Sequence, residues 1–309
     1  MMKAVPDPLW AKLRWKLCLP EYLHRPAQIL RRFRRELNPP QQYEIVRLPW
    51  GLELRIRLPE LMSNSLWYKG IYDITSSETI WRLLDEGESA LDIGANIGYM
   101  TSLMAARVGE RGKVLAFEPH AGLFVELESN CKHWAGTSGV GKVEAKNVAL
   151  SDRQGVARLQ LPPDWEMNRG VASVVSSELV AGVSLSQSVN LERLDHLLPD
   201  MAQVGLAKLD VEGHEAAVLQ GAENLLERRA IRDIVFEDIE GYPSAAMKLL
   251  ESHAYSLFSL AKSFYAPRLC GVDRAGVSVR NDPNYLATLN PDRAIQRMRR
   301  KGWNVLKEV

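Results

Sequence analysis

The chain has 309 residues, of which 46% are hydrophobic and 25% are charged, and its formal net charge is +1. This length is enough for one large domain or two small ones with a substantial core. The composition excludes a disordered chain, a collagen-like repeat and a uniformly charged polyelectrolyte binder. The three cysteines, Cys18, Cys131 and Cys270, form no C-x-x-C pair, which is typical of a reducing compartment and argues against a zinc knuckle.

A membrane-spanning helix is not expected, because it needs about 18–20 consecutive apolar residues. The longest uncharged run, from Ile93 to Ala106, is shorter and contains Gly94, Asn96 and Gly98. Charged residues also interrupt the N-terminus, so it does not resemble a signal peptide. We therefore expect a cytoplasmic protein.

Residues 1–37 form a basic segment with nine Lys or Arg residues and three acidic ones. Its apolar residues recur at helical spacing as Leu9, Leu13 and Leu17, and then as Leu30, Phe33 and Leu37. This pattern predicts two short amphipathic helices broken near Pro20, within an N-terminal extension of residues 1–42. One interpretation is a peripheral contact with the inner membrane surface or with a partner. The other is that the apolar stripes pack on the protein's own domain while the arginines face water.

From residue 43 onwards the pattern predicts a domain that extends to residue 290. Alternating apolar residues in 43–59 predict a β-hairpin, and Thr75-Ser-Ser-Glu78 predicts a helix that begins with a capping box. The later strands are expected at 89–93, 113–117, 143–148, 156–161, 206–211, 231–237, 255–260 and 285–289, and the helices at 98–108, 123–133, 218–229 and 245–253. This alternation predicts a doubly wound, mostly parallel α/β sheet, and the last two strands suggest an antiparallel edge.

The first chemical signal is a glycine loop, Asp92-Ile-Gly94-Ala-Asn96-Ile-Gly98, where the strand at 89–93 turns into its helix. Ligands of such sheets bind at the carboxyl ends of the strands. The dinucleotide fingerprint G-x-G-x-x-G is absent, and Asp92 favours a cationic group over a pyrophosphate. Glu118 ends the next strand, where an acid accepts hydrogen bonds from ribose hydroxyls. Together these residues point to S-adenosylmethionine. The alternative is that Asp92 caps the following helix and that Glu118 is a solvated strand end.

The second signal is the segment Lys208-Leu-Asp210-Val-Glu212, which places three ionisable groups on one face of a strand. Buried polar groups are costly unless they are paired or used, so we expect Lys208 to pair with a carboxylate. Asp210, Glu212 and His214 are the candidates for a general base that takes a proton from an acceptor hydroxyl. His214 has the most suitable ordinary pKa, and Asp210 has the most central position. A solvent-facing His214 at a helix start is the alternative.

A divalent metal is the competing hypothesis for this cluster. Asp210, Glu212, Glu237 and Asp238 offer oxygens that suit Mg²⁺ or Ca²⁺. Because no spacing fixes a ligand set, no metal is expected.

Two further segments do not follow the alternation of strands and helices. Residues 165–188, which include Trp165 and Arg169, form an insertion that either covers an acceptor pocket or is a ribbon with a disordered tip. Residues 291–309 form a basic amphipathic tail, most simply a solvated helix.

At this point the sequence resembles the FkbM family of methyltransferases. The matching stretches are Leu91–Tyr99, Ala116–Pro119, Asn147–Asp152, Lys208–Glu215 and Val218–Ala222, followed by the strand that ends in Glu237. The resemblance covers about residues 66–260. It implies a Rossmann-like class I methyltransferase that uses S-adenosylmethionine, generally on a hydroxyl oxygen, and it implies that Asn147 and Asp152 lie near the adenine.

The sequence thus predicts an S-adenosylmethionine-dependent O-methyltransferase. The family resemblance suggests a sugar, a glycan or a natural product as acceptor, with no nucleic-acid partner. One rival is a nicotinamide-dependent sugar oxidoreductase, which the missing G-x-G-x-x-G disfavours. Another is a non-catalytic relative that binds a membrane or a partner through its basic ends. The oligomeric state is not indicated.

Overall fold

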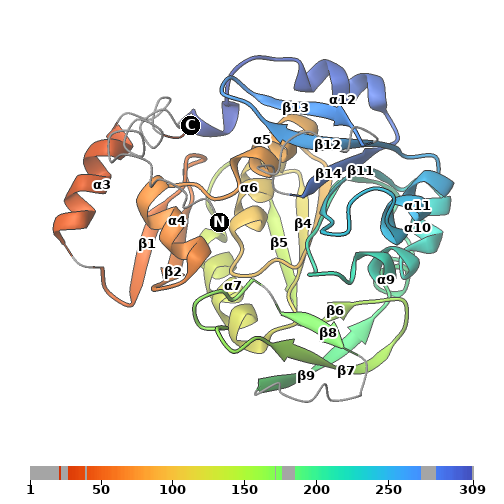
Figure 1. Ribbon diagram of the computed structural model, residues 1–309, viewed down its shortest axis with the longest axis horizontal. Coiled ribbons are helices and arrows are strands. Elements are labelled where there is room, and N and C mark those ends of the chain that lie inside the picture. The colour runs from red at the N-terminus through yellow and green to blue at the C-terminus, as the bar shows by residue number, and fades with distance from the viewer. Residues whose placement is uncertain are drawn as a thin grey trace, which may run out of the picture.

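A computed structural model describes residues 21, 27–38, 40–170, 172–175, 185–272 and 283–307. The first expected N-terminal helix lies outside these ranges. The main feature is an eight-stranded sheet (Figure 1). Its strands are, from edge to edge, β13 (Pro267–Gly271), β12 (Ser256–Lys262), β14 (Asn284–Thr288), β11 (Ile231–Glu237), β10 (Val204–Leu209), β3 (Ser89–Ile93), β4 (Lys113–Phe117) and β5 (Lys142–Lys146).

The centre of this sheet is parallel, because β11, β10, β3, β4 and β5 pair in one direction. Strand β14 pairs antiparallel with both β11 and β12. The predicted α/β fold with antiparallel strands at one side is therefore confirmed. The sequence placed the last two strands next to the core but did not predict β13, which forms the outer edge of the sheet.

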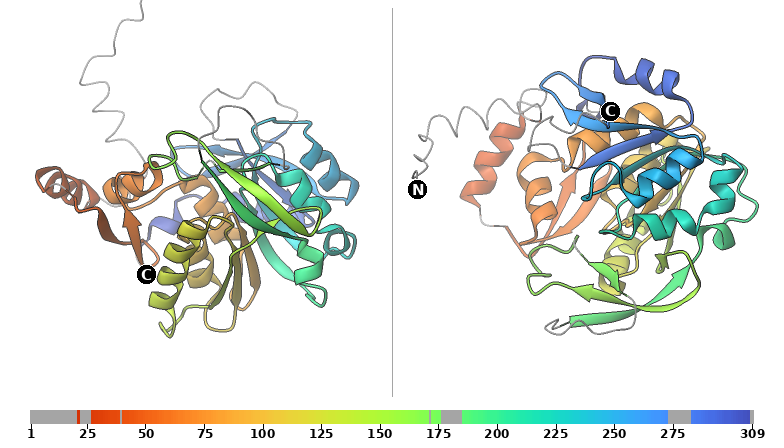
Figure 2. Two further views of the ribbon diagram at one scale, coloured as in Figure 1. Left: turned by 90° about the horizontal axis from the view of Figure 1, so that it is seen from below. Right: turned by 45° about the vertical axis from the view of Figure 1, so that its right-hand side comes forward.

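Helices cover both faces of the sheet, as Figures 1 and 2 show. Helices α5 (Ile74–Leu83), α6 (Tyr99–Val108) and α7 (Ala121–Trp134) pack on one face. The other face carries α8 (Leu194–Leu197), α9 (Glu215–Gln220), α10 (Glu223–Glu227) and α11 (Ala245–Ser252). In β3, Ala90 belongs to the first core, whereas Leu91 and Ile93 belong to the second. This alternation places Asp92 on the α6 side.

The hairpin predicted at 43–59 is confirmed as β1 (Tyr43–Arg47) and β2 (Glu53–Arg57). It packs on α7, where the Trp134 indole N–H donates to the Glu53 carbonyl at 2.6 Å. Helix α4 (Leu61–Lys69), which the sequence did not predict, follows the hairpin, and α3 (Ala27–Leu37) lies against α4. No helix among the described residues is long and apolar enough to cross a membrane.

A second, four-stranded sheet is inserted between β5 and β10. It has the order β6 (Ala149–Leu150), β9 (Leu185–Glu192), β7 (Gly155–Leu161) and β8 (Ser173–Val175). The ribbon predicted at 156–161 is confirmed as β7, but β9 was not predicted. The strand expected at 143–148 ends at Lys146. The single helix expected at 218–229 is wrong, because α9 ends at Gln220 and Gly221 packs so tightly that a Cβ there would lie 1.9 Å from the Ser151 carbonyl oxygen.

The capping box expected at Thr75–Glu78 is also wrong. Asp73 is the N-cap of α5, and its carboxylate accepts a hydrogen bond from the Ser76 N–H at 3.1 Å. Glu78 is fully buried and instead accepts from the Arg82 guanidinium at 2.6 Å and from the Val305 N–H at 2.7 Å. The carboxylate of Glu78 therefore binds the C-terminal segment, and Asp73 caps the helix.

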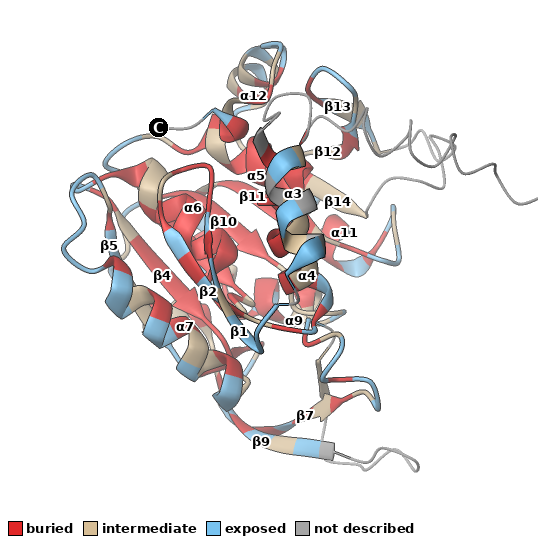
Figure 3. Cartoon of the chain, turned by 90° about the vertical axis from the view of Figure 1, so that its left-hand side faces the viewer, coloured by how far each residue is buried: buried red, intermediate tan, exposed pale blue. Residues whose placement is uncertain are grey.

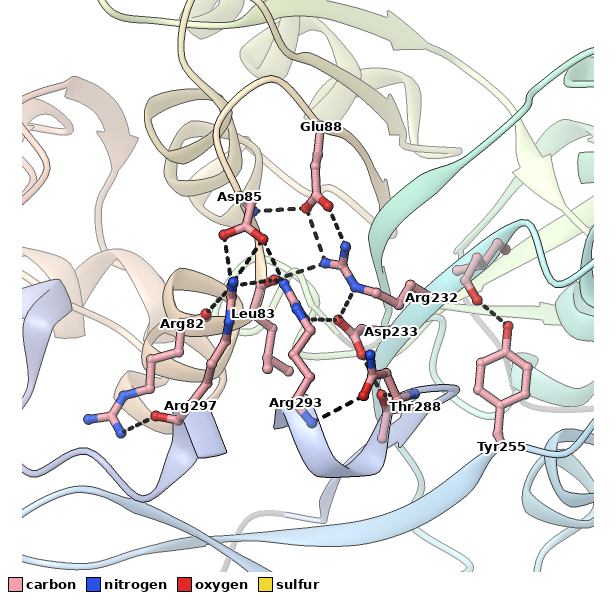
Figure 4. A network of polar contacts seen from close by, with 12 residues as sticks. Arg82, Leu83, Asp85, Glu88, Arg232, Asp233, Tyr255, Thr288, Arg293 and Arg297 are labelled. Carbon is pink, nitrogen blue, oxygen red and sulfur yellow. Dashed lines mark hydrogen bonds and ion pairs between the residues drawn. The ribbon is translucent and has the colours of Figure 1, made fainter. Parts of the chain in front are cut away.

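The C-terminal segment packs on α5, so the expected solvated tail is wrong for the part that is described. It consists of α12 (Pro291–Met298) and the 3₁₀ helix η1 (Asn304–Leu306), and Trp303 between them is fully buried. Figure 4 shows the polar network beside it: Arg293 and Arg297 each contact Asp85 at 2.8 Å, and Arg293 also contacts the buried Asp233 at 3.1 Å. Two of the basic residues of the tail are thus neutralised within the fold.

Candidate active site

A cavity of about 510 Å³ opens at the carboxyl ends of β3, β4, β10 and β11. Eight residues proposed from the sequence line it: Asp92, Gly94, Asn96, Glu118, Lys208, Asp210, Glu212 and His214. Gly98, Asn147 and Asp152 lie outside its lining. Helix α4, the start of α5 and the insertion after β7 supply further walls. The cavity thus combines the two chemical signals of the sequence in one place.

Asp92 is fully buried at the end of β3. One carboxylate oxygen, Oδ2, accepts a hydrogen bond from the Thr101 hydroxyl at 2.5 Å, while Oδ1 has no hydrogen-bond partner among the described residues. Burial raises the pKa of Asp92, and the nearby Lys208 opposes that rise. Asp92 does not cap α6, whose N-cap is Gly98, so the capping alternative is wrong. A buried oxygen without a partner is costly, and a ligand that donates a hydrogen bond would satisfy it.

The two glycines of the loop allow close contacts with other parts of the chain. A Cβ at Gly94 would lie 1.8 Å from the Asp210 carbonyl oxygen, and one at Gly98 would lie 2.8 Å from Leu127 Cδ1. Both glycines also have a left-handed backbone, with φ of 82° and 95°. Gly94 therefore lets the β3 loop approach the end of β10, and Gly98 lets α6 pack on α7.

Glu118 lies at the end of β4 and is only 5% exposed, so the solvated-end alternative is wrong. Its Oε2 accepts a hydrogen bond from the Asn96 N–H and its Oε1 accepts one from the His120 N–H, both at 2.8 Å. Burial raises the pKa of Glu118 to about 7, against the effect of these two amides. Glu118 thus joins the β3 and β4 loops, and each oxygen retains a lone pair for a ligand.

Asn147 and Asp152 are linked to the cavity through other residues. The Asn147 amide donates to the carbonyls of Glu118 and Pro119 at 2.8 and 3.0 Å. The Ser151 hydroxyl lies 3.0 Å from Asp152 Oδ1 and 2.9 Å from His214 Nε2.

His214 is partly buried, so the solvent-facing alternative does not hold. Burial also lowers its pKa. Through Ser151 it lies on the β6 side of the cavity, a placement that the sequence did not predict.

Lys208 and Asp210 form an ion pair with 2.7 Å between Nζ and Oδ2, which confirms the expected carboxylate partner. Burial opposes the charge of Lys208, but Asp210 and Asp92 together raise its pKa, so it is a cation. The strand itself ends at Leu209. Residues 210–214 form a turn, and the expectation of a strand to Val211 is wrong.

This turn holds Glu212 in a left-handed backbone conformation with φ of 54°, which is uncommon for a residue other than glycine. Glu215 supports the turn, because its Oε1 accepts hydrogen bonds from the Val211 and Gly213 N–H groups at 3.2 Å each. Burial raises the pKa of Glu212 to about 7, with contributions from Asp210 and Glu215. Glu212 is therefore a carboxylate that changes protonation near neutral pH.

Glu237, Tyr72 and Asp73 complete this side of the cavity. Burial and the charges of Asp210 and Glu212 raise the pKa of Glu237 to about 7, and burial raises that of Tyr72 to about 12. Tyr72 and Asp73 were not recognised in the sequence. Their only signal was a position just before a helix, and that alone does not place them over the strand ends.

Asp238 does not take part in the acidic cluster. It accepts hydrogen bonds from the Ser244 hydroxyl at 2.5 Å and from the Glu240 N–H at 3.0 Å. In the part of the chain that the structure describes, no group of three or more His, Cys, Asp and Glu side chains is arranged to hold a metal ion.

The described part of the insertion forms a wall of the cavity. Trp165 is 5% exposed, and its ring lies 4.7 Å from that of His120. Arg169 is equally buried and contacts both oxygens of Glu126 on α7, at 2.5 and 3.2 Å. Residues 171 and 176–184 are outside the described ranges, so the expectation of a disordered tip is not addressed. The remainder supports the pocket-covering interpretation.

The strand order, the antiparallel β14 and the acids that end β3 and β4 define a Rossmann-like class I methyltransferase. Residues 92–257 match the methyltransferase FkbM domain. The protein belongs to the FkbM family and is an S-adenosylmethionine-dependent methyltransferase. This membership removes the oxidoreductase alternative.

Two relatives and one solved structure illustrate the similarity. The chain is 29% identical over 211 residues to the 31-O-demethyl-FK506 methyltransferase FkbM of Streptomyces tacrolimicus, a match that covers 59% of this chain and 78% of that protein. It is 26% identical to the hexuronic acid methyltransferase AglP of Haloferax volcanii, over 63% and 81% of the two chains. A methyltransferase FkbM structure from Methylobacillus flagellatus KT aligns with a TM-score of 0.41 and 14% identity, over 66% of this chain and 44% of that chain.

Proposed function

We propose that the protein transfers a methyl group from S-adenosylmethionine to a hydroxyl oxygen of a sugar, a glycan or a natural product. The observation that carries this proposal is that two sets of groups line one cavity. Asp92 and Glu118 are the first set, with a buried oxygen that lacks a partner, and we assign them to the cofactor end. Glu212 and Glu237 are the second set, with carboxylates that suit proton transfer, and we assign them to the acceptor end.

The first end fits the cofactor by its donor set. Asp92 Oδ1 would accept a hydrogen bond from the ammonium group, and Glu118 would accept those of the ribose hydroxyls. Asn147 would act indirectly by holding the β4 loop, and Asp152 would act through Ser151 and His214 at the adenine side. Once bound, the cofactor supplies an electrophilic methyl group on a sulfonium, a cation that the surrounding carboxylates would stabilise.

Glu212 is the candidate base that the geometry favours. A general base works best with a pKa near the operating pH and with a free lone pair. Glu212 meets the first condition, and no hydrogen bond to its carboxylate is found among the described residues. One oxygen of Asp210 is occupied by Lys208, and His214 is directed to Ser151. We therefore assign Glu212 to accept the acceptor's proton, Lys208 and Asp210 to hold the turn, and His214 to the cofactor side.

The acceptor end suits a ligand rich in hydroxyl groups. Carboxylates accept hydrogen bonds from hydroxyls, and Glu212 and Glu237 both line this end. The names of the two relatives are consistent with oxygen acceptors on a natural product and on a sugar acid. These names support the class of acceptor proposed here.

The test is methyl transfer from radiolabelled S-adenosylmethionine to a panel of methyl hexosides, methyl hexuronides and macrolide alcohols. We expect labelled O-methyl ethers, located by mass spectrometry, and loss of label with Glu212→Gln. Glu128→Gln, an exposed change on α7, is the matched control. Methylation only at nitrogen or carbon would contradict the proposal.

A further inference from the structure

Helix α3 rests on α4 through its polar side chains. The Gln28 amide donates a hydrogen bond to the Tyr68 carbonyl at 3.1 Å. The Arg35 guanidinium lies over the Trp67 ring, 4.0 Å from its centroid, and that of Arg32 lies 5.6 Å from the Tyr68 centroid. Residues 28, 32 and 35 follow each other at helical spacing. An amide and two arginines of α3 thus contact α4.

Two leucines and an arginine are exposed on the opposite side of α3. Leu30 is 58% exposed and Leu37 is 83% exposed, and Arg34 between them is exposed as well. Leu30 and Leu37 therefore do not pack on the protein's own domain, as one interpretation of the sequence expected. The side chain of Phe33 and the first predicted helix lie outside the described residues, so that interpretation is not tested for them.

Strand β1 continues this surface. Tyr43 is 42% exposed and Ile45 is 59% exposed, whereas Val46 between Ile45 and Arg47 is buried. Arg47 is exposed on the same side of the strand. Figure 3 shows α3 and β1 on the side of the molecule that faces the viewer, each with exposed residues. We call Leu30, Arg34, Leu37, Tyr43, Ile45 and Arg47 the α3–β1 face.

We propose that the α3–β1 face docks on an anionic membrane surface. It combines four apolar side chains with two arginines, and Arg55 of β2 lies over the Tyr43 ring, 4.6 Å from its centroid. Glu53, which is opposite Arg47 in the hairpin, is an exposed acidic residue beside this face. Helices that lie in the interface of a bilayer combine apolar side chains with basic ones in this way, because the apolar groups enter the lipid while arginine contacts the headgroups. A contact with a second copy would instead bring together two faces that each carry these arginines, and the repulsion between like charges disfavours it.

Docking on this face would bring one wall of the cavity toward the membrane. Helix α4, on which α3 rests, lines the cavity with Leu61 and Lys69, and its N-cap Glu60 does so as well. Helices α3 and α4 would then lie between the lipid surface and the cavity. This placement suits an acceptor carried on a lipid, but the docking itself does not depend on the proposed methyl transfer.

The test is co-sedimentation of the full chain with vesicles of phosphatidylcholine alone or mixed with phosphatidylglycerol. We expect binding to the mixed vesicles, weakened by salt, and about a tenfold lower partition coefficient for Leu30→Ser combined with Leu37→Ser. Val156→Ser, at a residue of β7 that is 69% exposed, is the matched control. Unchanged melting temperature and unchanged affinity for S-adenosylhomocysteine would show that the double variant is folded.

Four results would overturn the proposal: no binding to either vesicle, equal binding to both, equal binding of the double variant, or a dimer in light scattering that the double variant abolishes. The last would assign the face to a second copy of the chain. Methyl transfer to a soluble acceptor is measured separately, so a failure of the proposed function would be seen in that assay and not in this one.

Discussion

The carboxyl groups around the cavity owe their chemistry to burial. Glu118, Glu212 and Glu237 each have a pKa of about 7, and in each the largest cause is the loss of water around the charged form. Such shifts are typical of functional sites. The walls of the cavity keep water away from these three carboxyl groups. The walls therefore raise the pKa values of the site.

Cofactor affinity should depend on pH through Glu118. A ribose hydroxyl donates to the ionised carboxylate, and Glu118 ionises as the pH rises through about 7. Affinity for S-adenosylhomocysteine should therefore fall as the pH is lowered from 8 to 6, by up to about tenfold per pH unit below the pKa. Calorimetry at several pH values measures this. A Glu118→Gln variant should bind weakly and lose most of this pH dependence, and a variant that keeps all of it would contradict the assignment.

The rate of methyl transfer should rise with pH as Glu212 ionises. Because the base must be unprotonated, kcat should increase through about pH 7. Glu212→Gln should lose about 10²–10⁴-fold in kcat without losing cofactor affinity. Asp210→Asn should retain this rise of kcat with pH, which we call the pH limb, because Asp210 only pairs with Lys208. If Asp210→Asn removes the limb and Glu212→Gln keeps it, the base is Asp210.

Several residues of the site could be read from the sequence. Asp92, Glu118 and the Lys208–Asp210 pair were predictable, because acids and a lysine at the ends of apolar strands have few structural uses. The packing role of Gly98 was not predictable, because it depends on Leu127 and Trp134 of a different helix. The sequence also could not predict that one oxygen of Asp92 lacks a partner, because only the fold shows that Thr101 bonds to the other oxygen.

The turn after β10 holds Glu212, the proposed base, in the cavity. Its left-handed residue is Glu212, and the carboxylate of Glu215 holds the amides on either side. Local strain of this kind persists only where the surroundings impose it. Glu215 therefore acts as a positioning residue for Glu212.

A pair of substitutions at Glu215 tests this role. Glu215→Ala removes the acceptor of both amides and should reduce kcat by about a hundredfold through misplacement of Glu212. Glu215→Gln keeps an oxygen that accepts both hydrogen bonds and should restore most of the rate. Steady-state kinetics at a saturating level of cofactor measure both variants. Equal rates for the two would mean that the hydrogen bonds to Val211 and Gly213 do not position the base.

The central strands and their helices were predictable because their apolar runs are long and regular. The sequence placed β3, β4 and β11 at their observed bounds. It missed α4, whose apolar and polar residues show no clear periodicity, and β9, whose pairing with β7 depends on residues far away in the chain. The break between α9 and α10 also depends on a distant contact, that of Gly221 with Ser151.

The near-zero net charge hides an uneven distribution of charge along the chain. Residues 1–37 carry nine basic and three acidic groups, and residues 291–309 carry six and two. The basic residues of these two segments have different surroundings in the structure. Arg293 and Arg297 are neutralised by Asp85 and Asp233, whereas Arg34 remains exposed on the α3–β1 face. Two of the C-terminal charges thus stabilise the fold, whereas Arg34 of the N-terminal segment is available to a surface.

The C-terminal segment should contribute strongly to stability. Trp303 is fully buried, and its indole N–H donates to the Phe264 carbonyl at 3.2 Å. Trp303→Ala should lower the free energy of unfolding by about 3–5 kcal/mol, as measured by urea denaturation. Arg299→Ala, at an exposed residue of the same segment, should change it by less than about 0.5 kcal/mol. A loss of under 1 kcal/mol for Trp303→Ala would mean that the segment is not part of the core.

A calorimetric titration with S-adenosylhomocysteine tests directly whether the cavity binds S-adenosylmethionine through Asp92 and Glu118. The wild-type protein should bind one molecule per chain. Glu118→Ala should bind it about 10–100-fold more weakly, because charge-assisted hydrogen bonds to the ribose are lost. No binding by the wild-type protein, or equal affinity in the variant, would contradict the account.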